Sequence, residues 1–257
     1  MKPLSEQQII TNLQQYDDTS ARYYSAWWLG KMRSKHPEAI PLLMNCLTDH
    51  MTNDQDQERR GVALNAIRAL GLLRDRNAIP SLITLLSSND YTIREEAARS
   101  LGALRAEEAV QPIGLLLKGG LDTAGSEQQP SSPQLKEPCE AFLEALGDIG
   151  VNTTEIVELI KPFTHHRRPL IRAAACRALL QLTQNVVWAN ELHELLRHPE
   201  PLVRRGALLD LGATGWLDAL PHIKTATVEA SLKLVALRGL AEQNEAIDVL
   251  NAMDELL

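Results

Sequence analysis

One sequence pattern recurs along almost the whole chain and limits the folds that the chain can adopt. Each copy has a pair of small residues followed by a leucine, often with an arginine before the pair and a glycine after the leucine. The leucines are Leu29, Leu70, Leu101, Leu146, Leu179, Leu211 and Leu240. Most copies lie roughly 30 residues apart, a period typical of α-helical repeat proteins. The pattern therefore predicts a repeat array rather than one compact core.

Within each unit the apolar residues follow helical spacing, as in Ala97, Ala98, Leu101 and Leu104. Patterns of alternating polarity, which would indicate strands, are nearly absent. Prolines stand where a first helical turn tolerates them, at Pro41, Pro80, Pro112 and Pro221. Each unit therefore reads as two short antiparallel helices. We predict one domain over 1–257, a right-handed α-solenoid of about six to seven HEAT-like helix pairs, curved with a concave groove.

Two wider gaps between repeats predict insertions. Residues 48–60 are polar and end in Arg59 and Arg60, and residues 119–138 are rich in glycine and proline. Both are expected to be loops. The second could be a flexible surface excursion or a lid over a groove.

Composition and charge exclude several classes of function. The net charge of -7 argues against a nucleic-acid partner, because phosphate binding needs clustered basic residues. No apolar run resembles a signal peptide or a membrane span, so we expect a cytoplasmic, soluble protein. Cys46, Cys139 and Cys176 lack the paired spacing of a disulfide framework or zinc site, although a transient role for Cys139 with an electrophilic ligand stays open. His165-His166 lacks a third metal ligand, so we expect a loop or turn there and no metal site.

The aromatic residues, only 4% of the chain, gather on one predicted helix as Tyr23, Tyr24, Trp27 and Trp28. Aligning the repeats places them opposite polar residues of the third repeat, at positions that face solvent or the groove. Residues four apart are neighbours on a helix surface, so the cluster forms two adjoining aromatic rows. These rows could bind a ligand or partner. The alternative is packing against an N-terminal helix.

The recurring arginines are Arg22, Arg94, Arg172 and Arg204. They could be a structural ladder, or they could bind an anion. Together with the aromatic rows they would suit a flat conjugated ligand that carries carboxylates. The candidate binding arginines are Arg22, Arg59, Arg60 and Arg94. No residue can be assigned a catalytic role.

The aromatic segment 23–30 resembles the Tyr-Tyr-Ala-Ala-Trp-Trp-Leu/Ile-Gly motif of the E-type subunits of the heterodimeric phycobilin lyases of cyanobacteria. Residues 137–141 resemble the family's Gln-Pro-Tyr-Glu-Ala, and residues 173–183 its Ala-Ala-Ala-Arg-Ala-Leu-Phe-Gln-Leu-Thr stretch. Residues 210–217 and 231–238 resemble its C-terminal blocks. The chain departs from the family at Cys139, where Tyr is usual, and before its second repeat, where a Gly-Gly-Tyr-Pro-Leu-Arg-Arg-Asn segment is usual.

The resemblance implies a lyase that acts with an F-type subunit and attaches phycocyanobilin through a thioether bond to a cysteine of the phycocyanin α subunit. The bilin would be a substrate, with no cofactor. The departures leave open a second interpretation, attachment with isomerisation to phycoviolobilin on the phycoerythrocyanin α subunit. A third is a non-catalytic HEAT-repeat module that binds phycobiliproteins during antenna assembly or turnover.

Overall fold

The computed structural model describes residues 3–52 and 56–257, which are helical apart from turns and one isolated bridge between Glu127 and Leu135. The all-α prediction is confirmed. The α-helices are α1 (Glu6–Gln14), α2 (Thr19–Lys31), α3 (Ala39–Thr52), α4 (Gln57–Leu73), α5 (Ile79–Leu85), α6 (Tyr91–Ala103), α7 (Val110–Leu117), α8 (Cys139–Ile149), α9 (Thr154–Ile160), α10 (Pro169–Thr183), α11 (Val187–Leu195), α12 (Pro201–Ala213), α13 (Leu220–Thr225), α14 (Ala230–Gln243) and α15 (Ile247–Asp254).

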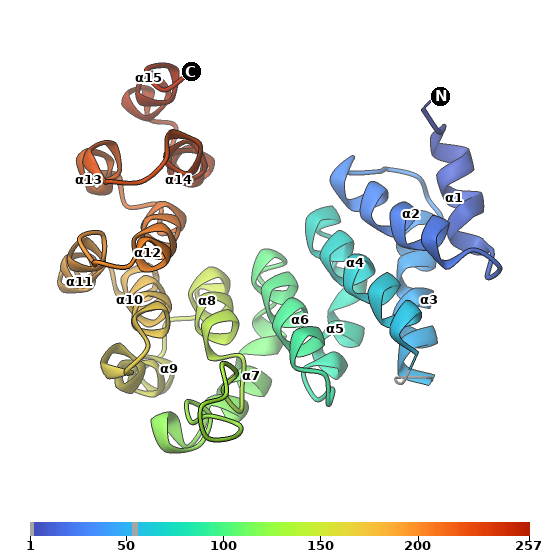
Figure 1. Cartoon of the computed structure of the whole chain (residues 1–257), viewed down its shortest axis with the longest axis horizontal. Coiled ribbons are helices and arrows are strands. Elements are labelled where there is room, and N and C mark those ends of the chain that lie inside the picture. The colour runs from blue at the N-terminus through green and yellow to red at the C-terminus, as the bar shows by residue number, and fades with distance from the viewer. Residues whose placement is uncertain (1–2, 53–55) are drawn as a thin grey trace. The chain divides into compact units, whose positions relative to one another are not determined.

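The chain forms two compact units, Met1–Ile113 and Gly114–Leu257, and the boundary falls within α7. Each unit has the helix pairing predicted for HEAT-type repeats. In the first unit α2, α4 and α6 lie side by side, and each also packs against the helix that precedes it in the chain (Figure 1). The single domain over 1–257 stays a prediction.

The glycine that follows the recurring leucine has a structural reason. A Cβ atom on Gly30 of α2 would lie 2.6 Å from the Cα of Ala69 on α4, and one on Gly71 of α4 would lie 3.0 Å from the Cα of Ser100 on α6. Such distances are too short for a side chain. Glycine therefore lets the α2, α4 and α6 backbones approach closely, while the preceding leucines are buried.

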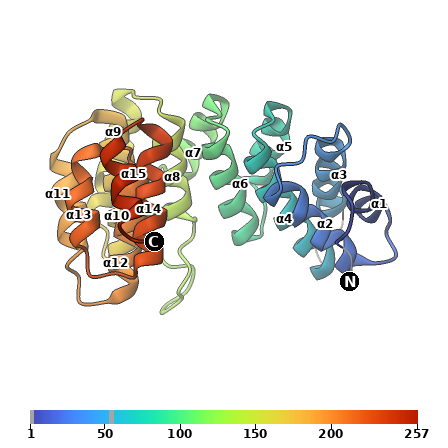
Figure 2. The same ribbon diagram turned by 90° about the horizontal axis from the view of Figure 1, so that it is seen from above.

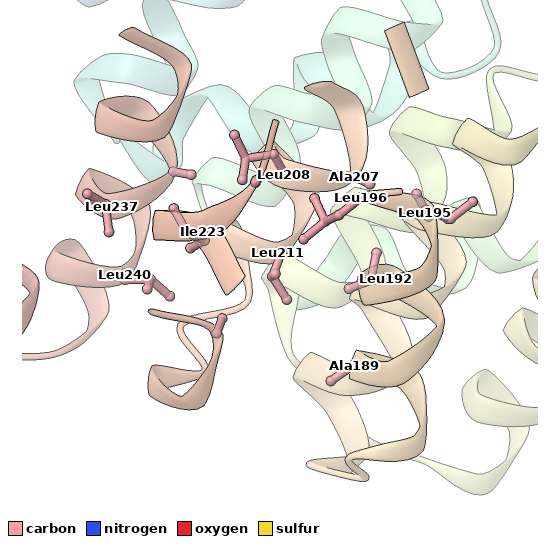
Figure 3. Packing of buried hydrophobic residues seen from close by; sticks show 14 of the residues in the cluster. Ala189, Leu192, Leu195, Leu196, Ala207, Leu208, Leu211, Ile223, Leu237 and Leu240 are labelled. Carbon is pink, nitrogen blue, oxygen red and sulfur yellow. The ribbon is translucent and has the colours of Figure 1, made fainter. Parts of the chain in front are cut away.

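The second unit repeats this arrangement with α8, α10, α12 and α14, which contact one another in chain order (Figure 2). Its core draws on successive helices: Leu192 of α11, Leu211 of α12, Ile223 of α13 and Leu240 of α14 are fully buried (Figure 3). In this core α11 and α13 lie beside each other, and both contact α12.

Three of the recurring arginines make the same structural contact. Arg94, Arg172 and Arg204 each donate from Nη1 to the carbonyl oxygen six residues earlier, at distances of 2.8, 3.0 and 2.8 Å. Each bond ties the first turn of a helix to the turn before it. This geometry favours the structural interpretation of the arginine ladder.

The expectation of a loop over 48–60 is wrong for most of that range. Helix α3 continues to Thr52 and α4 begins at Gln57, while 53–55 lie outside the described residues. His50, polar by sequence, lies within α3 and is buried at 3% exposure. Asp56 caps α4 by accepting from the amides of Glu58 and Arg59.

The insertion at 119–138 is irregular, as predicted, and it is fastened at several points. Arg168 donates to the carbonyl oxygen of Ser132 at 2.8 Å and also bonds that of Pro133. The ring of His166 is buried and lies 2.9 Å, through Nε2, from the Gly125 carbonyl oxygen. These bonds connect the insertion to the turn before α10. His166 thus lies in a turn, as expected, whereas His165 ends the 3-10 helix Lys161–His165.

No helix in the described part of the chain is both long enough and apolar enough to cross a lipid bilayer.

Candidate functional site

Helix α2 is held in place at its first turn. Asp18 caps it by accepting from the amide of Ala21 at 2.9 Å. Arg22, only 4% exposed, pairs with Asp49 at 2.8 Å and donates to the Leu13 carbonyl oxygen. Burial lowers the pKa of Arg22, but the bond to Asp49 and the other neighbouring groups together outweigh this, and the pKa lies above the usual value. Arg22 therefore fixes α2 to α3 and to the end of α1.

The opposite side of α2 carries the aromatic cluster. Tyr23, Tyr24 and Trp27 are 49%, 44% and 45% exposed, whereas Trp28 is half-buried. The rings of Tyr24 and Trp27 are tilted, with centroids 5.6 Å apart. Three of the four predicted side chains thus form one open surface. Trp28 instead lies at the repeat position of Ser100, which is buried and donates to the Ile67 carbonyl oxygen.

Helices α4 and α6 extend this surface with polar residues. The amide Nδ2 of Asn65 donates to the carbonyl oxygen of Tyr23 at 3.1 Å. Arg68 bonds Glu96 of α6 at 2.6 Å, which raises the pKa of Arg68, and its charge also interacts with Tyr23. We call Tyr23, Tyr24, Trp27, Arg68 and Glu96 the aromatic face. An aromatic half on α2 thus adjoins a charged half on α4 and α6.

Sequence reasoning missed Arg68 and Glu96 as members of this surface. A signal was present, because Trp27, Arg68 and Arg99 each stand two residues before the recurring leucine of their helix. Residues at one repeat position lie on equivalent surfaces of stacked helices. Counting back from the leucines would have found Arg68 next to Trp27.

The other predicted arginines lie elsewhere. Arg60 makes a two-point bond to Asp90, the cap of α6, with one contact of 3.1 Å. Burial raises the pKa of Asp90, but the bond to Arg60 and those from the amides of Ile93 and Thr92 together outweigh it, and the pKa falls below its usual value. Arg59 pairs with Asp56 at 3.1 Å, and Arg94 bonds the Ser88 carbonyl oxygen. These contacts hold helix ends, and a role in ligand binding stays a prediction for all three.

The three cysteines are poor nucleophiles. All are buried, and burial raises the pKa of Cys46 to about 11 and those of Cys139 and Cys176 to about 12. A thiol reacts as its thiolate, which these values suppress at neutral pH. The sulfur of any thioether must therefore come from another chain. The transient role of Cys139 with an electrophilic ligand, which the sequence left open, finds no support.

Fold and surface together define a HEAT-type repeat protein with an open aromatic face, a class built for binding rather than for chemistry by its own nucleophile. Residues 51–120 match the HEAT repeats family model, and residues 21–49, which include most of α2, match the PBS lyase HEAT-like repeat. The aromatic cluster thus lies within the more specific of the two matches.

Relatives that match over nearly the whole chain point to the same family. The chain is 59% identical to bilin biosynthesis protein RpcE of Synechococcus sp. (strain WH8020) over 99% of this chain and 96% of that protein. It is 41% identical to phycocyanobilin lyase subunit alpha of Picosynechococcus sp. (strain ATCC 27264 / PCC 7002 / PR-6), over 98% of this chain and 96% of that one. Among solved structures, the complex of CpcE and CpcF of phycocyanin lyase from Nostoc sp. PCC7120 matches with a TM-score of 0.85 and 41% identity, over 100% of this chain and 96% of that one. The chain belongs to the family of E-type phycobilin lyase subunits.

Proposed function

We propose that this chain is the E-type subunit of a heterodimeric lyase that attaches phycocyanobilin to a cysteine of the phycocyanin α subunit through a thioether bond. It acts with an F-type subunit in the cyanobacterial cytosol, where antenna proteins are assembled. The bilin is its substrate, and no further cofactor is needed. Relatives named phycocyanobilin lyase subunit alpha support attachment of this bilin without isomerisation.

The observation that carries the proposal is the aromatic face on a chain of this family. Tyr23, Tyr24 and Trp27 offer flat surfaces with polar tips, and Arg68 adds a guanidinium group beside Tyr23. An open-chain tetrapyrrole presents complementary groups: planar pyrrole rings and two propionates that can accept from arginine. Because Arg68 is already paired with Glu96, a propionate would compete with that carboxylate.

The reaction itself is an addition in which nothing leaves. The acceptor sulfur bonds to the exocyclic carbon of the ring A ethylidene group, and a hydrogen bonds to the adjoining ring carbon. This chain supplies no nucleophile, since its thiols are buried. Its contribution is to hold the bilin so that one face meets the acceptor thiolate, and such positioning alone lowers a barrier by up to about 7–11 kcal/mol.

The test is co-expression of this chain, an F-type subunit, the enzymes that make phycocyanobilin, and the phycocyanin α subunit. The products are separated by denaturing electrophoresis, which preserves covalent bilins, and are detected by zinc-enhanced fluorescence. We expect a fluorescent α subunit that disappears when this chain is omitted. A phycocyanobilin-like absorption spectrum of that product supports attachment without isomerisation.

Two results would contradict the proposal. A blue-shifted, phycoviolobilin-like product on the phycoerythrocyanin α subunit would identify an isomerising lyase instead. Absence of any covalent band, with a stable complex between this chain and the α subunit, would identify a binding module. The control is an α subunit whose acceptor cysteine is replaced. Any fluorescence that this α subunit keeps after electrophoresis comes from bilin that is not covalently bound.

A further inference from the structure

A second candidate site lies in the second unit and plays no part in the proposed lyase reaction. A pocket of about 510 Å³ opens between α11, α13, the first turn of α12 and the segments that follow α11 and α13. Its polar lining includes three histidines, two arginines and two threonines, and none of the described residues that line it is acidic. On a chain with a net charge of -7, such a lining is unexpected. We call it the imidazole pocket, after His193, His198 and His222.

The histidines at the back of the pocket are stacked. The rings of His193 on α11 and His222 on α13 lie 3.5 Å apart between centroids, and Trp216 stacks on His193 at 5.7 Å. Atom Nε2 of His193 is buried and has no hydrogen-bond partner among the described residues. A buried polar atom without a partner destabilises the folded state, so a bound group that bonds this atom would be favoured.

The hydrogen bonds of Arg204 go to neutral carbonyl oxygens, although its charge also interacts with the carboxylate of Glu229. Arg204 donates to the carbonyl oxygens of His198 at 2.8 Å, Pro199 at 2.9 Å and Thr227 at 3.3 Å. Carbonyl oxygens satisfy its N–H groups but do not neutralise its charge. The nearby carboxylate of Glu229 is bonded to Arg205 instead. The guanidinium group therefore holds a fixed charge at the edge of the pocket.

We propose that the imidazole pocket binds a small oxyanion, a carboxylate or a phosphate group. Its imidazole and guanidinium groups are donors when the histidines are protonated, and oxyanions accept charge-assisted bonds of this kind. A metal ion does not fit, because the described residues include no group of three or more His, Cys, Asp or Glu side chains placed to hold one. The site is independent of the aromatic face, which belongs to the first unit.

Anion binding should be coupled to proton uptake. Burial, then the neighbouring His222 and Arg197, lower the pKa of His193 to about 4, while Glu194 on the same helix opposes them weakly. At neutral pH the His193 ring is therefore neutral in the empty pocket. A bound oxyanion favours the protonated ring, so it raises the pKa of His193 and binds more tightly as the pH falls.

The experiment uses the full chain labelled with 15N-histidine, titrated by NMR with inorganic phosphate or with succinate, and with chloride at equal ionic strength as the control. We expect saturable shifts of the His193 and His222 ring signals with at least one oxyanion and none with chloride. Affinity should rise as the pH is lowered from about 8 to about 6, because a bound oxyanion raises the pKa of His193 above its value of about 4 in the empty pocket. Saturation by phosphate alone or by succinate alone would identify which anion the pocket takes.

Matched variants separate binding from folding. His222→Gln, and separately Arg197→Gln at an exposed position of the pocket rim, should each weaken binding by about tenfold, the usual effect of one lost charge-assisted bond. Arg238→Gln removes one exposed charge from α14 outside the pocket and should leave affinity unchanged. The proposal fails if neither anion gives saturable shifts, or if Arg238→Gln weakens binding as much as the two pocket variants do.

Discussion

Asn65 of α4 reaches across to α2 and donates from Nδ2 to the carbonyl oxygen of Tyr23, 3.1 Å away. Because Asn65 is only 3% exposed, this bond is shielded from water and sets the position of the aromatic segment against its neighbour. It connects the buried packing of the first unit with the surface that we assign to the bilin.

Asn65→Ala should therefore lower both stability and transfer. Loss of one intramolecular hydrogen bond with a shielded donor costs about 1 kcal/mol in the free energy of unfolding. We also expect slower bilin transfer, because Tyr23 and Trp27 lose a fixed position. Urea unfolding and the co-expression assay measure the two effects. The exposed Asn190→Ala on α11 is the control, and equal losses in both variants would contradict a specific tether.

The aromatic side chains should matter for transfer and little for folding. Trp27→Ala removes a 45% exposed ring, so the helical circular dichroism should stay intact. Covalent transfer should fall by more than about tenfold if Trp27 is an anchor of the bound bilin or partner. Leu115→Ala, at a 68% exposed apolar residue of α7, is the comparison. Collapse of the helical signal would instead show that Trp27 supports the core.

Close helix packing predicts opposite effects at two glycines. In Gly30→Ala the new Cβ meets the Cα of Ala69 at 2.6 Å, a backbone atom that cannot turn away, so we expect a loss of about 1–3 kcal/mol. In Gly114→Ala the new Cβ has ordinary contacts of 3.6 Å or more, and alanine is favoured over glycine in a helix by about 1 kcal/mol. Thermal unfolding should thus move in opposite directions. A stabilised Gly30→Ala would refute the packing argument.

A buried ion network in the second unit predicts a dependence on pH. Arg177 lies 2.7 Å from Asp148, 3.3 Å from Asp210 and 3.9 Å from Glu144, so one guanidinium group faces three carboxyl groups. Burial raises the pKa of Asp210 to about 7, against the attraction of Arg177 and with the help of Glu144. The folded chain therefore keeps a proton on Asp210 that the unfolded chain releases at lower pH.

The sign of the effect follows from that proton. Between about pH 4, where an unfolded aspartate titrates, and about pH 7, the folded state binds more protons, so stability falls as pH rises. Asp210→Asn removes this contribution. The difference in unfolding free energy between the original chain and Asp210→Asn should decline across this window and flatten above it. Asp218→Asn, at an exposed position, should show no such slope.

The sequence predicted the repeat array well because its signals are local. Leucine, the small pair and glycine at fixed spacing reflect burial and close helix approach, and the structure shows both at Leu29 and Gly30. The exposed positions of Tyr23, Tyr24 and Trp27 followed from repeat alignment alone. Composition misled at His50, whose polar side chain suggested a loop although tertiary packing buries it.

Pairings between distant residues could not be predicted. Arg22 looked like a ligand-binding residue by its type. Only the fold shows that its guanidinium group already bonds Asp49 and the carbonyl oxygen of Leu13. The imidazole pocket could not be predicted for the same reason. His193 and His222 are far apart in the chain and share no motif, so only the packing of α11 beside α13 brings them together.

The shared position of Trp27, Arg68 and Arg99 has an evolutionary consequence. Helices α2, α4 and α6 each contribute one side chain there, two residues before a leucine that carries the packing. Mutation at that site can change the chemistry of the surface without disturbing the interior. A lineage can thus diversify its chromophore preference one repeat at a time, with the scaffold inherited unaltered.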